Sequence, residues 1–147
     1  MKKLALFLIL VMSTSLFTIA QDKIELDRVP EPVKTTFNEK YNGAVKQKWT
    51  KEKKSYNVKF LLNKCKGNAS FNDDGKWTGG TLKIKKLTDL PQEVQDGFTK
   101  SEFGVWGIRE IFVQENGYEK LYYFGVKTKG QPLRYISFKE NGEQKGK

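Results

Sequence analysis

Side chains suited to catalysis are scarce in this sequence. It contains no histidine among its 147 residues, which removes Ser/His/Asp and Cys/His nucleophile systems, the imidazole metal ligand and the commonest general base. Two well-placed carboxylates can hydrolyse a glycosidic bond, so a carboxylate-only hydrolase stays as the enzymatic alternative. Most acidic residues, however, lie in turn-like segments or beside lysine, where they are solvated. We therefore predict no catalytic residue, no cofactor and no enzymatic activity.

Oxygen-bearing side chains gather in the segment Asn72–Gly75, which resembles part of a calcium loop. An EF-hand loop continues to a distant bidentate Glu, and none stands at the required spacing. The similar segment Lys139–Gly142 carries a lysine among its potential ligands. Both segments instead predict hairpin turns with Gly75 and Gly142 in the left-handed conformation, and no metal site.

The single cysteine, Cys65, cannot form an internal disulfide. Its neighbours Lys64 and Lys66 would lower the pKa of an exposed thiol and make it reactive. Cys65 also shares strand parity with Ala69 and Phe71, which would turn it toward the core as a small apolar residue. Both interpretations stay open, and the inert one is favoured.

Aromatic and lysine side chains are the strongest candidates for binding. Aromatic residues make up 13% of the chain, enough for a core and a surface. Those in phase with apolar stripes predict the core: Phe37, Tyr56, Phe60, Phe71, Phe98, Phe112 and Phe138. Others are out of phase and predict a mixed surface of rings and ammonium groups that binds a partner: Trp77, Tyr123, Tyr135, Lys46, Lys48 and Lys59. The alternative is that these lysines only keep an exposed sheet soluble.

The first twenty residues predict a secretory signal peptide, with Lys2-Lys3, the apolar run Leu4–Val11 and a small-residue end at Ala20, near which we expect cleavage. A membrane anchor is the alternative, but polar residues interrupt the apolar stretch. The remaining chain has 25 basic and 17 acidic residues, a net charge of +8. We expect an exported protein, periplasmic or secreted, with an acidic protein, polysaccharide or membrane surface as partner and no nucleic acid.

Two segments of the sequence have the same spacing of apolar residues, and each predicts a helix that packs on the sheet. Val33, Phe37 and Tyr41 recur at every fourth position after Pro30, which predicts a helix over 31–41, ended by the following Asn-Gly pair. The second segment repeats the interval with Pro91, Val94 and Phe98, and Gly104 is expected to close its helix.

After each helix the apolar period changes to two, which predicts strands bounded by turn residues. Among these turns, Asn116-Gly117 is the strongest signal for a type I′ hairpin. Ala69–Gly75 reappears as Ile136–Gly142, so we predict a duplicated unit of one helix and about four antiparallel strands, spanning 21–86 and 87–147. The predicted class is α+β, with both units docked into one larger curved sheet, the helices on one face and the other face open.

The sequence resembles the exported PepSY-like and β-lactamase-inhibitor-protein-like (BLIP-like) domains. The resemblance lies in the segments Val29–Phe37, Trp49–Tyr56 and Phe71–Lys76 and in their counterparts from Leu90 to Gly142. That resemblance implies tandem units that form a saddle whose concave sheet face grips another protein. The chain departs from the pattern after Gly142, where we expect a short last strand. The predicted function is an exported, non-enzymatic binding protein that inhibits or modulates an envelope protein or hydrolase. A module for anionic polysaccharide or membrane surfaces is the alternative.

Overall fold

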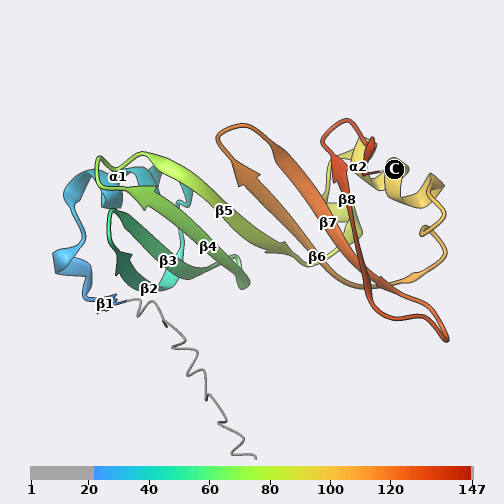
Figure 1. Ribbon diagram of the computed structural model, residues 1–147, viewed down its shortest axis with the longest axis horizontal. Coiled ribbons are helices and arrows are strands. Elements are labelled where there is room, and N and C mark those ends of the chain that lie inside the picture. The colour runs from blue at the N-terminus through green and yellow to red at the C-terminus, as the bar shows by residue number, and fades with distance from the viewer. Residues whose placement is uncertain (1–21, 147) are drawn as a thin grey trace, which may run out of the picture.

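The computed structural model describes residues 22–146, which form a nine-stranded antiparallel sheet and two α-helices, an α+β fold (Figure 1). The strands lie in chain order, each paired with its neighbour in the sequence. They are β1 (Asp22–Ile24), β2 (Val45–Glu52), β3 (Ser55–Leu62), β4 (Cys65–Asn72), β5 (Trp77–Ile84), β6 (Gly107–Asn116), β7 (Lys120–Lys127), β8 (Arg134–Lys139) and β9 (Gln144–Lys145). The predicted signal peptide lies outside the described residues. Within 22–146, no helix has the length and apolar character needed to span a membrane.

Two α-helices, α1 (Glu31–Lys40) and α2 (Gln92–Lys100), each follow a short 3-10 helix, η1 (Leu26–Arg28) and η2 (Leu87–Asp89). A proline stands at each N-cap, where its missing N–H removes no helical hydrogen bond. The helix predicted over 31–41 is confirmed. The prediction that Gly104 closes the second helix is wrong, because α2 ends at Lys100 and the Ser101 hydroxyl donates a 2.7 Å hydrogen bond to the Phe98 carbonyl.

Both helices cover the same face of the sheet. Val33 and Phe37 of α1 pack in one core cluster that reaches Leu82 of β5. Val94 and Phe98 of α2 pack in a second cluster that reaches Ile84, two residues further along the same strand. Residues two apart in a strand point to the same side. We call this side the helix face and the other the open face. All four helix residues are buried, as predicted.

Two aromatic side chains lie on the opposite face from the one predicted. Phe112 was expected in the core, but it pairs with Tyr123 on the open face, while its neighbour Ile111 enters the core. Trp77 was expected on the open face, but it packs against the first core cluster. Its strand contains a bulge, because Ser70 pairs with Gly79 and the next residue, Phe71, pairs with Trp77. This extra residue reverses the alternation and turns Trp77 to the helix face.

Some of the turns have the conformation that the sequence predicts, and one does not. Gly75 and Gly142 have φ of +83° and +81°, the left-handed conformation predicted for both. Asn116-Gly117 does not form the predicted type I′ turn, since neither residue has positive φ. Instead the Asn116 side chain accepts hydrogen bonds from the Tyr118 and Glu119 backbone N–H groups. The Asn116 N–H donates to the Glu119 carbonyl, so the turn lies at Gly117 and Tyr118.

Candidate binding face

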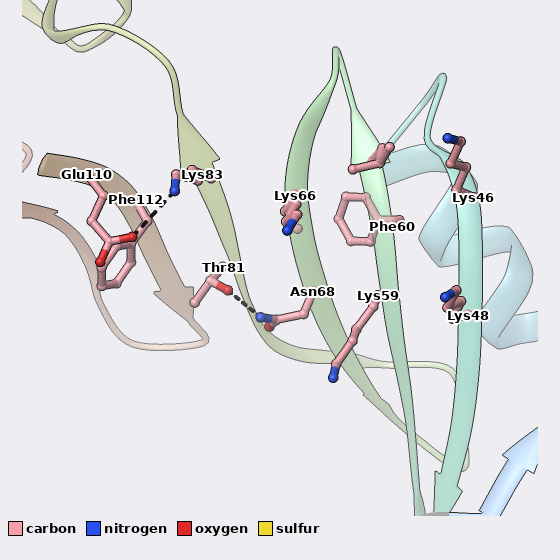
Figure 2. A pocket seen from close by; sticks show the side chains of 12 residues that line it. Lys46, Lys48, Lys59, Phe60, Lys66, Asn68, Thr81, Lys83, Glu110 and Phe112 are labelled. Carbon is pink, nitrogen blue, oxygen red and sulfur yellow. Dashed lines mark hydrogen bonds and ion pairs between the residues drawn. The ribbon is translucent and has the colours of Figure 1, made fainter.

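The open face carries a groove of about 580 Å³ over strands β2 to β6 (Figure 2). Strand alternation brings its side chains together, because every second residue of each paired strand points to this side. The register places Lys48 opposite Lys59, Lys59 opposite Asn68, and Asn68 opposite Thr81. The residues that border the groove are Lys46, Lys48, Lys59, Phe60, Leu61, Lys66, Gly67, Asn68, Thr81, Lys83, Glu110 and Phe112. Among them, Phe60 packs in the core on the helix face, and Gly67 stands opposite it on the neighbouring strand.

The groove is strongly positive, with five lysines and a single carboxylate among its lining residues. Glu110 lies 3.5 Å from the Lys83 ammonium. Within residues 22–146 the other four lysines form no ion pair; they are Lys46, Lys48, Lys59 and Lys66. Lys48 and Lys59 stand directly opposite each other on adjacent strands. Two like charges in such a cross-strand pair repel each other and destabilise the sheet. The positive potential of the groove is therefore largely unneutralised from within the described fold.

A cluster of three aromatic side chains borders the groove on the β6 side. The Phe112 and Tyr123 rings stack, with centroids 5.0 Å apart and planes 4° from parallel. Tyr135 lies across from Phe112 at 6.3 Å and remains half exposed, at 53%. We call Phe112, Tyr123 and Tyr135 the aromatic edge. It gives the open face an apolar surface beside the lysines.

Glu110 connects the aromatic edge to the lysines. Its carboxylate accepts a 2.5 Å hydrogen bond from the Tyr135 hydroxyl and pairs with Lys83. The Tyr135 hydrogen bond, aided by the Lys83 charge, holds the pKa of Glu110 below its ordinary value. The same hydrogen bond raises the pKa of Tyr135. At neutral pH the pair is therefore a neutral phenol that donates to an ionised carboxylate.

A second hollow of about 390 Å³ extends the basic surface toward β1. It shares Lys48, Lys59 and Asn68 with the groove and adds Lys23. Ser70 donates a 2.6 Å hydrogen bond to the Asn57 side chain in this part of the face. The basic surface of the open face thus continues beyond the groove itself.

Five of the six side chains predicted to bind a partner lie on the open face. Lys46, Lys48 and Lys59 line the groove together, and Tyr123 and Tyr135 belong to the aromatic edge. Trp77 is the exception, and its indole N–H donates a 3.1 Å hydrogen bond to Tyr41 beside α1. Whether these residues bind a partner stays a prediction.

Sequence reasoning predicted three of the residues that line the groove and missed the others, among them Lys66, Lys83, Glu110 and Phe112. A signal for the lysines was present, because Lys66 alternates with Gly67 and Ala69, and Lys83 lies between Leu82 and Ile84. Nothing comparable marks Glu110, since its role depends on the pairing of β6, β7 and β8 that brings it to Tyr135.

No group of three or more acidic, cysteine or histidine side chains is placed to hold a metal within residues 22–146. Cys65 is a free, half-buried thiol beside Lys64 and Lys66 in a hollow that adjoins the groove and shares Lys66 with it. It belongs to neither core cluster. Its reactivity remains a prediction.

The sequence matches no protein-family model and no curated protein. Similar folds occur among solved structures. A protein from Bacteroides eggerthii, provisionally assigned to the periplasm, is 21% identical, with 80% of this chain and 86% of that chain covered and a TM-score of 0.65. A DUF2874 family protein from Bacteroides ovatus is 19% identical, with coverages of 80% and 84% and a TM-score of 0.65.

A BLIP-like protein from Bacteroides fragilis has the same TM-score of 0.65 at 16% identity, with 78% of this chain and 82% of that chain covered. At such identities the likeness concerns the fold alone. The chain therefore has a BLIP-like fold, the class that the resemblance of its sequence implied.

Proposed function

We propose that this protein is an exported, non-enzymatic binding protein that holds another protein against the open face of its sheet. The observation that carries the proposal is the groove itself, where four lysines that have no ion-pair partner among residues 22–146 adjoin three partly exposed aromatic side chains. Large aromatic rings supply contact area at low entropic cost, and lysines steer the approach of an acidic partner. The absence of histidine from the sequence supports a role without catalysis.

Export is supported by the predicted signal peptide. It is also supported by the similar fold of the Bacteroides eggerthii protein, which is provisionally assigned to the periplasm. The BLIP-like fold of the Bacteroides fragilis protein favours protein binding. We propose that the protein bound at the open face is an envelope protein or hydrolase, which this chain inhibits or modulates. The PepSY-like part of the resemblance stays a prediction.

We further propose that the chain consists of two copies of one unit, 21–86 and 87–147. Each helix phenylalanine meets a strand phenylalanine edge to face: Phe37 and Phe71 at 6.3 Å and 74°, Phe98 and Phe138 at 6.3 Å and 78°. Each strand phenylalanine is followed by a hairpin whose glycine contacts the first turn of the helix, Gly75 at Pro32 and Gly142 at Glu93. Side-by-side docking of two such units would generate the continuous open face.

The binding role can be tested by site-specific photo-crosslinking in the cells that produce the protein. A benzophenone amino acid in place of Tyr123 is expected to capture one defined protein, because that position lies at the aromatic edge. The same group in place of Lys100, an exposed residue at the end of α2, is the control. Equal capture from both positions, or none from Tyr123, would contradict the proposal.

The second candidate function is a module for anionic polysaccharide or membrane surfaces. It is favoured by the lysine content of the open face, where Lys23 extends the positive surface beyond the groove. Binding of this kind is screened by salt. It would vanish at moderate ionic strength and would be indifferent to Tyr135→Ala, whereas a protein complex that uses the aromatic edge would be weakened by that substitution.

A further inference from the structure

We propose that the groove receives an acidic segment of the partner protein, with its carboxylates over the lysines and an adjoining apolar side chain against the aromatic edge. This inference rests on the proposed function and names the chemistry of the partner. The two ends of the groove would then have separate roles. The lysines would recruit the segment, and Phe112 and Tyr123 would retain it.

The lysine end is built for several carboxylates. Lys46 and Lys48 lie on β2, Lys59 on β3 and Lys66 on β4, and none has an ion-pair partner within residues 22–146. These strands span about 10 Å at ordinary sheet spacing. An extended peptide covers that distance in about three residues. Because side chains alternate along an extended chain, an acidic run of four residues would place two carboxylates over these strands and relieve the repulsion between Lys48 and Lys59.

The other end of the groove does not favour a continuous polyanion. Glu110 is fixed there by Tyr135 and Lys83, so a uniformly charged polymer that crossed the face would meet an ionised carboxylate. A protein segment can change from acidic to apolar within one residue. Its apolar side chain would pack against the Phe112 and Tyr123 rings, which are stacked and only partly buried.

A bilayer surface also fits the groove less well than a peptide. The lysines line a hollow of about 580 Å³, and Figure 2 shows their side chains from close by. Phosphate groups in the plane of a membrane cannot all enter such a hollow, whereas a peptide can follow its floor. A protein ligand thus accounts for the recess, the lysines and the aromatic edge together.

The test uses two synthetic peptides and the whole mature protein. One peptide has four successive glutamates followed by two leucines, and the other has serines in place of the leucines. Binding is measured by fluorescence anisotropy at low salt, and the site by amide chemical shifts. We expect the leucine peptide to bind more tightly and to shift amides of β2 to β7.

Variants separate the two ends of the groove. Lys59→Glu should weaken both peptides about tenfold, because it reverses a central charge. Lys129→Glu makes the same change of net charge in an exposed loop and should alter affinity less than about twofold. Phe112→Ala should weaken the leucine peptide about fivefold and leave the serine peptide unchanged. Lys59→Gln, which preserves solubility on the exposed strand, should give an intermediate loss.

Polygalacturonate and phosphatidylglycerol vesicles serve as competing ligands. Tighter binding of either one than of the leucine peptide, with Lys59 required and Phe112 irrelevant, would overturn the inference. Failure of both peptides to bind up to millimolar concentration would overturn it as well. The proposed function would survive that result if Tyr123 crosslinks still captured one protein, so the two failures can be told apart.

Discussion

The two faces of this sheet are made by the same strands and differ in almost every property. On the helix face, Phe71, Phe124 and Phe138 are buried completely and pack edge to face or against α1 and α2. On the open face, the neighbouring positions carry lysines and the partly exposed Phe112. Strand pairing positions both sets, but only the first contributes much apolar burial to folding. Substitutions on the open face should therefore affect binding far more than stability.

The comparison is tested most strongly by two phenylalanines of equal size. Phe37→Ala should lower the free energy of unfolding by about 3 to 5 kcal/mol, because its ring is buried among four aromatic neighbours. Phe112→Ala should cost only about 1 kcal/mol, because the substitution removes the stack with Tyr123 and the looser contact with Tyr135 on a partly exposed face. Urea unfolding followed by circular dichroism measures both. Equal losses would mean that the open face belongs to the core.

The hairpin glycines test whether both helices are docked in the same way. A Cβ at Gly75 would lie 2.6 Å from Pro32, and one at Gly142 would lie 2.2 Å from the Glu93 carbonyl oxygen. Ala at either site should destabilise by about 2 to 4 kcal/mol through contact and backbone strain. Gly130→Ala is the control, with φ of +76° and open space around it. It should cost only the strain, about 1 kcal/mol. A large effect at one hairpin alone would argue against two equivalent units.

Trp77 offers a smaller test of its assignment to the helix face. Its indole N–H donates to Tyr41, and the Lys40 ammonium lies 3.9 Å from the ring centre. Trp77→Phe keeps a ring but removes the donor, so we expect a loss of about 1 kcal/mol in the free energy of unfolding. Binding of the Tyr123 crosslinking partner should not change. If Trp77→Phe abolished crosslinking from Tyr123 without changing the free energy of unfolding, Trp77 would instead belong to the open face.

The sequence predicted the elements of the fold better than the faces of its strands. The four-residue spacing of Val33 and Phe37 places both on one side of a helix, so the buried side could be predicted directly. Phe112 stands between Ile111 and Val113, so the run has no alternation from which a face could be chosen. Trp77 was misplaced because a bulge changes parity without a distinct sequence signal. The groove could be anticipated only as separate lysines, since the strand register brings them together.

The subtlest expected difference concerns the hydrogen bond between Tyr135 and Glu110. This bond raises the pKa of Tyr135 above its ordinary value of 10.0 and lowers the pKa of Glu110. The tyrosine contribution to stability is therefore present below pH 10 and lost as pH rises through the raised pKa. The glutamate contribution is present above the ordinary carboxyl pKa and lost as pH falls through the lowered one.

Replacing the carboxylate separates these effects. Glu110→Gln should return the pKa of Tyr135 toward 10.0, because the amide oxygen accepts the hydrogen bond without a charge that opposes ionisation. NMR titration of labelled tyrosine rings measures the shift, with Tyr135→Phe used to assign the resonance. Glu143→Gln, which removes a carboxylate bound to Lys139, is the control and should leave Tyr135 unchanged. An unaltered Tyr135 titration in Glu110→Gln would show that the link between the aromatic edge and the lysines does not hold in solution. The two ends of the groove would then act without Glu110 between them.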